Sequence, residues 1–450
     1  MNVRTGLCAV LALFILAGSA LGDPSANPMG LRDCLSMCLE KNPNLKRLEA
    51  RARQAEARVG EVLAGKDFKL GLSGNYLQTS PEISINLPMP SSVSPANGVI
   101  IPASAYAANL TLSKLLSSFG QLENSGLLAS AQADQERLNF FIARRDFVQA
   151  TIAGYIQILR TRALERLAKD TVKSWEEHLR QSQALLSNGV VARYDVLRAE
   201  VEVSKSRDSV TTADKAVDLS VVSLKNLLGM KGEDSFEILG DDAETILSPE
   251  SLKKIPLDEA RRAALAKRSE MTLADCLMRQ GEAVLRIARG VTNPNLNFTT
   301  TYTSKTATFM SRDWQWQTGV ALNLPLFTGG DRPSKIRQAE EIIRQAAFAK
   351  EDTALRIGLE VESAWLSFNE AVQRRETALS QLAQAKEGLR LAELRYREHL
   401  SSSVEMVDAQ TACTSAQVNL ENSRYNELEA ALNLKKALGY FENGEVPDAK

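Results

Sequence analysis

The chain has 450 residues, and its 54 basic and 55 acidic side chains leave a net charge of −1. This balance argues against nucleic acid as a partner, because proteins that bind nucleic acid carry a basic surface. The sequence has two histidines, no serine-elbow motif and no glycine-rich cofactor loop, so it indicates no catalytic, cofactor-binding or metal-ligating residues and argues against an enzyme.

Residues 1–22 have the pattern of a secretory signal peptide. Arg4 precedes an apolar run from Leu7 to Ala17, and a small-x-small cleavage motif ends at Gly22. The alternative, a transmembrane anchor, would need about 20 apolar residues. We therefore expect the mature chain to begin near Asp23.

Four cysteines follow this leader, and we expect them to be small buried residues on helix faces. Cys34 and Cys38 lie four residues apart in an expected helix, where a disulfide is awkward but not excluded, so their oxidation state stays open. Cys276 and Cys413 are far apart in the sequence, and no zinc pattern is present.

Two segments of the first half alternate between apolar and polar residues, which is the period of a β-strand. In residues 68–80, Leu70, Leu72 and Tyr76 are separated by polar or small residues, and residues 103–114 alternate in the same way. The two segments predict a β-hairpin.

The next part of the chain predicts very long helices. No proline occurs between Ala103 and Ser248, and proline breaks helix interiors. A helix over residues 121–187 would span roughly 100 Å at 1.5 Å per residue. Its apolar residues recur at spacings of three and four, which is typical of coiled-coil packing between antiparallel helices. These residues include Val148, Ile152, Tyr155 and Leu159.

Asn188 and Gly189 interrupt this pattern and predict the turn of a helical hairpin. Residues 230–256, rich in Gly, Pro and acidic side chains, are expected to link two halves of the chain. We expect this link and the C-terminal tail to wrap the midsection of the helices.

The second half of the chain repeats the first. Gly120 and Tyr155 correspond to Gly330 and Trp365, 210 residues later. We therefore expect a first repeat over 23–240, made of a helix, a β-hairpin and a long helical hairpin, and a second repeat over 241–450 that includes the C-terminal tail.

In the second repeat, we expect strands at 295–306 and 314–325 and a helical turn at 401–403. The first repeat carries extra residues in a proline-rich insertion between Tyr76 and Leu112.

Four strands per chain cannot close a β-barrel alone, because single-chain barrels start at about eight strands. Two copies would give eight strands and an interior filled by side chains, whereas three copies would give twelve and leave room for water. Aromatic residues lie on or beside the strands, as an aromatic girdle at a membrane interface requires. They are Tyr76, Tyr106, Tyr302, Trp314 and Trp316.

Residues 320–339 resemble the strand-to-helix junction of the outer-membrane efflux protein family, the TolC-like channels, and residues 111–130 are similar. Residues 193–210 and 403–420 resemble the helix-turn segments of that family. The resemblance extends from about Leu31 to Tyr440. The junction residues are Gly120, Pro325, Gly329 and Gly330, and Leu115 stands where the second copy has Pro325.

The resemblance implies an α+β, mainly α membrane protein with an internal duplication. It implies a homotrimer whose twelve-stranded β-barrel in the outer membrane continues into a long α-helical coiled-coil tunnel across the periplasm. Family members are passive exit ducts of tripartite efflux or type I secretion systems. The implied partners are outer-membrane lipid, a periplasmic adaptor (membrane fusion) protein and an inner-membrane pump.

The resemblance also implies a gate at the periplasmic tips of the helices. Tyr396, Glu405 and Asp408 occupy the positions that narrow and charge the opening in the family, and Asp195 and Arg193 lie near the equivalent turn of the first copy. Threefold symmetry would turn Glu405 and Asp408 into acidic rings, which favour cations in a pore. Charges at hairpin tips can also be merely solvated.

Ser401 replaces a basic residue that is often found after the second turn in this family, so hydrogen bonding at the gate is expected to differ.

The competing interpretation is a periplasmic coiled-coil adaptor or structural protein. Adaptors also combine a signal peptide with a helical hairpin. They usually carry glycine-rich, lipoyl-like β motifs around a single hairpin, whereas this sequence predicts two equivalent hairpins. The sequence does not indicate which substrate is exported.

Overall fold

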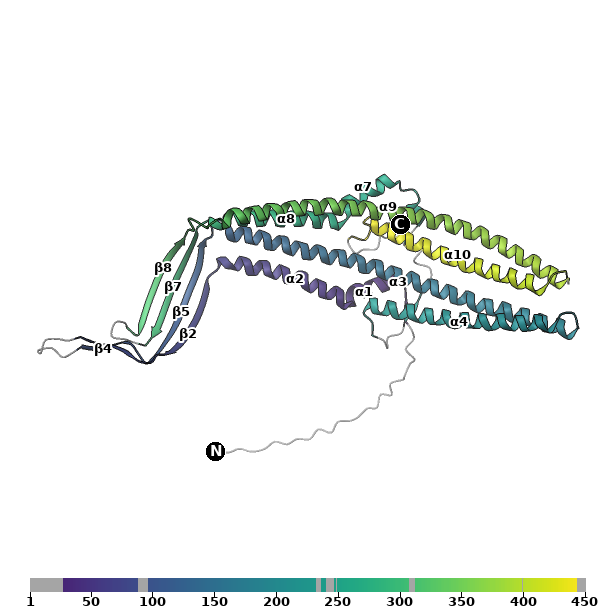
Figure 1. The fold of residues 1–450 in the computed structure, drawn as a ribbon, viewed down its shortest axis with the longest axis horizontal. Coiled ribbons are helices and arrows are strands. Elements are labelled where there is room, and N and C mark those ends of the chain that lie inside the picture. Colours follow the sequence, from purple (N-terminus) through teal and green to yellow (C-terminus); the bar gives the residue numbers. More distant parts are fainter. Residues whose placement is uncertain are drawn as a thin grey trace, which may run out of the picture.

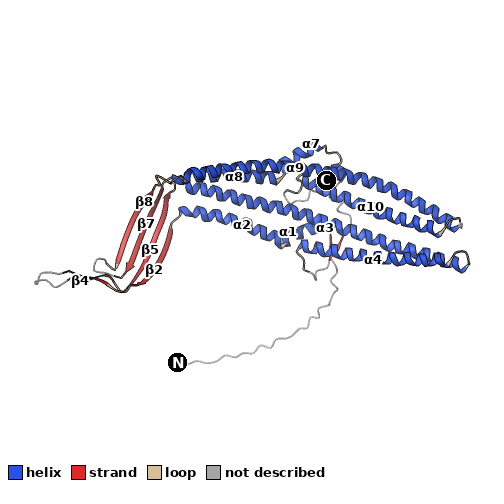
Figure 2. Cartoon of the chain, viewed as in Figure 1, coloured by secondary structure: helices blue, strands red, loops and turns tan. Residues whose placement is uncertain are grey.

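The computed structural model of the chain describes residues 27–87, 96–231, 236–239, 247, 249–306, 312–398 and 400–442. The expected signal peptide lies outside these residues. The described part is an elongated molecule, with a sheet at one end and long helices over the rest (Figure 1, Figure 2). None of the described helices is long and apolar enough to cross a bilayer.

The helices of the two halves follow each other in the same order and with nearly the same lengths. In the first half they are α1 (Leu31–Lys41), α2 (Pro43–Leu63), α3 (Gln121–Ser187) and α4 (Arg193–Leu228). Their counterparts are α7 (Leu257–Lys267), α8 (Ser269–Arg289), α9 (Asp331–Arg397) and α10 (Ser403–Ala437). Shorter helices are η1 (Ala64–Lys66), α6 (Pro249–Leu252) and η2 (Gly290–Thr292). The prediction of a single helix over 121–187 is confirmed, and α9 has the same length of 67 residues.

The main sheet has four antiparallel strands in the order β2, β5, β7, β8. The strands are β2 (Lys69–Gln78), β5 (Ser104–Ser117), β7 (Asn295–Lys305) and β8 (Trp314–Asn323). Each predicted hairpin is therefore formed, and the two hairpins join through β5 and β7.

Two of the predicted strand ends that differ from the structure share one explanation. The segment predicted at 103–114 continues to Ser117, and Leu115 still pairs with Asn297. The segment predicted at 314–325 stops at Asn323. Pro325, the counterpart of Leu115, has no N–H to donate to a strand ladder. The second copy therefore leaves the sheet earlier than the first.

The proline-rich insertion contains a further hairpin. Strands β3 (Ile83–Leu87) and β4 (Ala96–Ile101) pair antiparallel in a separate two-stranded sheet. The hairpin continues from β2 and β5 and extends beyond the end of the main sheet that is remote from the helices (Figure 1).

Each half contains a joint at which the end of one helical segment meets the start of another. Gly229 follows α4 with a φ of 68°, and a Cβ atom there would lie 3.0 Å from the carbonyl oxygen of Lys41. Gly439 follows α10 with a φ of 79°, and a Cβ there would lie 3.1 Å from Cβ of Lys267. Both positions need glycine for the left-handed backbone and for the close approach.

At the first joint the Asn42 side chain both caps α2 and donates a 2.8 Å hydrogen bond to the carbonyl of Leu227 at the end of α4. The pairs α2 with α4 and α8 with α10 therefore run end to end along α3 and α9 (Figure 1).

The described parts of residues 230–256 lie against the midsection of the helices, as expected. Strand β6 (Phe236–Ile238) pairs in parallel with β1 (Asn27–Met29). The Tyr155 hydroxyl on α3 donates to the carbonyl of Leu239, and Nε1 of its counterpart Trp365 on α9 donates to the carbonyl of Ile255 at 3.1 Å. Duplicated aromatic donors thus fasten the linking segment at two places.

Candidate functional site

One face of the main sheet is polar across all four strands. The register aligns Gly71, Thr111, Thr301 and Gln317 in one row and Ser73, Asn109, Thr303 and Gln315 in the next. The hydroxyls of Thr111 and Thr301 are 3.1 Å apart, and the Thr303 hydroxyl donates to Oδ1 of Asn109 at 2.8 Å. These two rows of hydroxyls and amides, with Lys69 and Lys305 farther along the same face, are suited to contact with water.

The opposite face is apolar and aromatic. Its central row aligns Leu72, Leu110, Tyr302 and Trp316, and the rings of the last two lie 6.2 Å apart. Tyr76 pairs with Tyr106, and Trp314 belongs to the same face. All five predicted girdle residues therefore share one face, near the strand ends that are remote from the helices.

This apolar face is exposed in a single chain. Leu72 is 78% exposed and Trp316 is 63% exposed, far above what an isolated soluble surface usually shows for adjacent large apolar residues. At the helical end of the face, Nζ of Lys114 lies 4.3 Å from the ring centre of Phe68. The face therefore has an apolar band bounded by aromatic and charged groups.

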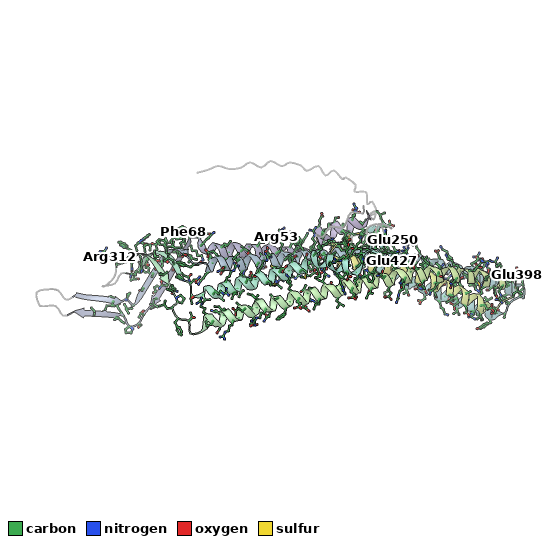
Figure 3. The ribbon with its side chains drawn as sticks, turned by 90° about the horizontal axis from the view of Figure 1, so that it is seen from above. Arg53, Phe68, Glu250, Arg312, Glu398 and Glu427 are labelled. Carbon is green, nitrogen blue, oxygen red and sulfur yellow. The ribbon has the colours of Figure 1, made fainter. Side chains whose placement is uncertain are left out.

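The helical tips form the other end of the molecule. Glu398 lies at this end, whereas Phe68 and Arg312 lie at the sheet end (Figure 3). Here the two hairpins meet. The Ser403 hydroxyl on α10 donates to a carboxylate oxygen of Asp195 on α4, and Asp195 also accepts the N–H of Ala192 at 3.2 Å. Asp195 therefore closes the first turn of α4 and binds the first residue of α10 in the other hairpin.

Glu405 and Asp408, predicted for the gate, lie at the same tips and are exposed, whereas Asp195 is half-buried. A carboxylate oxygen of Asp408 is 4.0 Å from a guanidinium nitrogen of Arg198, and one of Glu405 is 3.8 Å from Arg395. These long, solvated pairs leave most of the negative charge available to solvent. Arg193, the first residue of α4, is also exposed.

Tyr396, in contrast, is buried and only 6% exposed. Its ring centre lies 5.7 Å from that of His178 on α3, and His178 lies 5.9 Å from Trp175. A cavity of about 170 Å³ adjoins these rings and is lined by Ser174, Glu177, His178, Gln181, Glu393, Tyr396, Arg397 and Met406. In the single chain, Tyr396 therefore links the hairpins from inside their interface and does not project from the tip.

Comparison with known proteins decides the family. The model of the outer membrane efflux protein family matches residues 34–230 and 260–440. The chain belongs to this family. Among its relatives, the toluene efflux pump outer membrane protein TtgC of Pseudomonas putida is 27% identical over 357 residues, which cover 76% of this chain and 71% of the relative. The outer membrane protein TolC of Escherichia coli is 21% identical over 414 residues, which cover 90% of this chain and 81% of TolC.

Solved structures of efflux-channel relatives have the same fold. The chain is similar to CusC with a TM-score of 0.75 at 17% identity, covering 91% of this chain and 92% of CusC. It is similar to the CmeC outer membrane channel of Campylobacter jejuni with a TM-score of 0.73 at 17% identity, covering 93% of this chain and 87% of CmeC.

Membership of the efflux protein family establishes an outer-membrane channel that extends into the periplasm and serves as an exit duct. Members of the family form trimers and work with adaptor and pump proteins. The competing interpretation as an adaptor was therefore wrong. The family and the fold are those of a passive channel.

The junction residues of this family member lie where the sheet turns into the long helices. Gly120 and Gly330 precede α3 and α9 with φ values of 93° and 89°, and Gly329 has a φ of 57°. Left-handed backbone of this kind strongly favours glycine. Pro325 lies between the end of β8 and Gly329.

A buried ion network at the midsection was missed in the sequence. Arg145 on α3 is 2.8 Å from both Glu270 on α8 and Glu442 near the C-terminus. Arg268 pairs with Glu270 at 2.6 Å and with Glu360 on α9. The network therefore ties α3, α8, α9 and the C-terminal segment together where the joint of the second half lies.

The charges of this network reinforce one another. Burial alone would lower the pKa of Arg145, but hydrogen bonds and charge from Glu442 and Glu270 outweigh burial and raise it. Burial would raise the pKa of Glu270, but Arg268 and Arg145 lower it to about 2. The sequence contained a sign of this buried charge. Arg145 lies three residues before Val148, so a charged residue occupies a position of the apolar stripe of α3.

Proposed function

We propose that three copies of this chain close into one tube, which is the exit duct of a tripartite pump, with its gate at the helical tips. In this arrangement the twelve strands form a closed cylinder with the polar face inside and the apolar face toward lipid. We also propose that residues 23–240 and 241–450 are the two repeats, so that each copy supplies two quasi-equivalent sectors of the tube.

This proposal rests on one observation. The unpaired edges of the sheet lie on the same two sides of the chain as the unpaired edges of the helical layer. The sheet ends in β2 on one side and β8 on the other. In the tip half, the helices pack in the order α4, α3, α10, α9, and in the sheet half in the order α2, α3, α8, α9 (Figure 1). Because β2 follows α2 and β8 precedes α9, both layers have their open edges on the same two sides.

The open helical edges are apolar, as a contact between copies requires. Exposed apolar residues of α9 recur at spacings of seven and four, the spacing of a coiled-coil seam. They are Phe348, Leu355, Leu359 and Leu366. Exposed apolar residues of α4 include Tyr194, Leu197, Val201, Leu219 and Val222. An exposed sheet edge and exposed apolar stripes both favour pairing with another chain.

Within this tube, Glu405 and Asp408 are proposed to form acidic rings at the opening, next to Asp195 and Arg193. Tyr396 is proposed to act from within the hairpin interface. Glycines 120, 329 and 330 and Pro325 would redirect the chain from cylinder to tunnel, and the five aromatic residues of the apolar face would form the outer girdle. Their shared face and the exposure of both carboxylates support these roles.

The proposed cargo is small organic molecules. The relatives at 27% identity are named for the efflux of toluene and of antibiotics, and a further relative for pyoverdine export. The polar face of the sheet supports this choice, because its two central rows are uncharged and its lysines, Lys69 and Lys305, lie at the two ends of the face.

Single-channel current in a planar bilayer tests the gate and the pore together. We expect the purified wild-type protein to give discrete, long-lived steps with a preference for cations. The double variant Glu405→Ala, Asp408→Ala should open more readily, with more variable conductance, and should lose much of the cation preference, because the acidic rings are removed.

The matched control is Glu351→Ala with Glu376→Ala, which removes the same charge from exposed positions of α9 away from the tip. This control should keep the cation preference of the wild type. Unchanged ion selectivity in the Glu405→Ala, Asp408→Ala variant would show that these two residues are not part of the gate. Folded, trimeric protein that gives no steps even with the tip variant would contradict the duct itself.

A further inference from the structure

His178 occupies the contact between the two helical hairpins. It lies on α3, in the first hairpin, and is only 4% exposed. Its ring lies between Trp175 of the same helix and Tyr396 at the end of α9, in the second hairpin. Any movement that separates the tips must therefore pull Tyr396 away from His178.

The interface around His178 is polar but poorly satisfied by protein groups. Three buried polar atoms here have no hydrogen-bond partner among the described protein atoms: Nδ1 of His178 and the hydroxyls of Ser182 and Tyr396. Ser182 lies one helical turn beyond His178 on the same face of α3. Buried polar groups in native structures are usually hydrogen-bonded, so several without a partner near one ring are unusual.

The closed contact is consequently weaker than an apolar seam would be, because unsatisfied buried polar groups cost free energy. The adjoining cavity of about 170 Å³ is polar and large enough to admit water to the histidine ring. The hairpin contact is thus accessible to solvent protons without first being opened.

Charged groups face His178 from several helices. Glu177 of α3 and Glu393 and Arg397 of α9 line the adjoining cavity. Asp195 of α4 acts on the ring through its charge, while α10 contributes the uncharged Met406 to the cavity wall. Asp195 is also the residue that accepts the hydrogen bond of Ser403, so the two contacts between hairpins share a neighbour.

We propose that His178 is a positioning residue of the gate: its neutral ring holds the tips together through Tyr396, and its protonation in acid releases them. The proposal rests on the proposed gate at the helical tips and adds a proton as the regulating ligand.

The sign of the effect follows from burial. Burial lowers the pKa of His178 below its ordinary value of 6.5, and the nearby charge of Asp195 offsets this only in part. When the tips separate, the ring becomes exposed and its pKa returns toward 6.5. The closed form is therefore favoured fully above about pH 6.5, and it loses stability relative to the open form as the pH falls below that value.

Between the two pKa values, each copy can shift the equilibrium toward the open form by up to about tenfold per pH unit. The test is the open probability of the full-length trimer in planar bilayers from pH 7.5 to pH 5. We expect the wild-type open probability to rise as the pH falls below about 6.5. His178→Gln, which keeps a polar side chain but cannot be protonated, should show no such rise while still conducting.

His399→Gln is the matched control, because it removes the other histidine of the chain and should keep the response to acid. The double variant Glu405→Ala, Asp408→Ala is expected to be more open at neutral pH, but it should still open further in acid, since His178 is retained. His178→Met, which is similar in volume and apolar, serves as a second variant should the glutamine variant fail to assemble, and it should likewise lose the response.

Two outcomes overturn the inference. One is a pH profile of His178→Gln, or of His178→Met, that equals the wild-type profile. The other is loss of the acid response in the carboxylate double variant or in His399→Gln. In either case, the proposed function as a duct still stands if wild-type trimers conduct. Absence of channels from folded wild type and from all variants would instead contradict the duct.

Discussion

Arg145 is a buried cation in the middle of a 67-residue helix, with a side chain that is only 3% exposed. Its position is stable because Glu270 and Glu442 each approach to 2.8 Å. A buried ion pair is itself only weakly stabilising, but removal of one partner leaves the other charge buried and unpaired. The three residues therefore behave as a unit that holds the C-terminal segment on α3.

Arg145→Ala is expected to lower the free energy of unfolding by about 3–5 kcal/mol, because it removes the cation that pairs with Glu442 and one of the two cations that pair with Glu270. The matched control is Arg374→Ala, which removes an arginine whose pair with Glu370 is exposed, with side chains 71% and 60% accessible. Its effect should stay below about 1 kcal/mol. Denaturant unfolding of the solubilised protein, followed by circular dichroism, measures both, and equal losses would refute the network.

Single residues of the site could be predicted only in part. Glu405, Asp408 and Asp195 were placed at the tips from family resemblance, and they do lie there. The burial of Tyr396 was not foreseen, because it depends on which faces of two different hairpins meet. His178 carried a weak signal, since it follows Trp175 by three residues and so lies at the apolar stripe of α3.

At the scale of elements, the main sheet has one mainly polar face and one mainly apolar face. Leu72 and Ser73 are neighbours in β2 with opposite faces, one in the row of Trp316 and the other in the row of Gln315. Because the strand period is two, adjacent positions are ideal probes of which face meets lipid.

Leu72→Arg is expected to reduce the amount of folded protein in the outer membrane strongly. A basic residue on a lipid-facing strand position costs about 2–4 kcal/mol near the bilayer centre. Ser73→Arg introduces the same side chain on the polar face and should leave the folded amount close to wild type. Quantifying folded protein in outer-membrane fractions compares the two. Equal tolerance of both variants, or greater loss with Ser73→Arg, would contradict the assignment of the faces.

The sequence predicted the long elements well, because their periodicity is repeated many times within each helix and again in the second copy. It did not predict β3 and β4 as strands, since the prolines of that insertion masked a short alternating pattern. Strands β1 and β6 have three residues each, and they exist because they pair with each other against α3. Such short strands depend on tertiary contacts that local sequence does not contain.

At the scale of the whole molecule, a single chain leaves edges of both its sheet and its helical layer unpaired. Its sheet has two open edges, its helical layer has two open apolar edges, and both pairs of edges lie on the same sides. Pairing β8 of one copy with β2 of the next also brings α9 of the first against α2 and α4 of the second. One rotation between neighbouring copies therefore pairs the open sheet edges and the open helical edges at the same time. Repeating this rotation closes the tube.

Disulfide cross-linking of the two sheet edges in the outer membrane tests this closure most directly. The variants combine Gly71→Cys on β2 with Gln315→Cys, Gln317→Cys or Gly319→Cys on β8, to sample the possible registers between copies. Within one chain these edges are separated by three strand spacings of about 4.8 Å, or roughly 14 Å. That distance is beyond the about 7 Å that a disulfide can bridge. The native cysteines of the described chain are buried, so they should not interfere.

We predict that at least one combination gives covalent species of two and three chains and none larger, and that each single-cysteine variant on β8 gives no three-chain species. Single chains throughout the series, from protein that is folded in the outer membrane, would contradict closure through these edges, and so would an open-ended ladder of larger species.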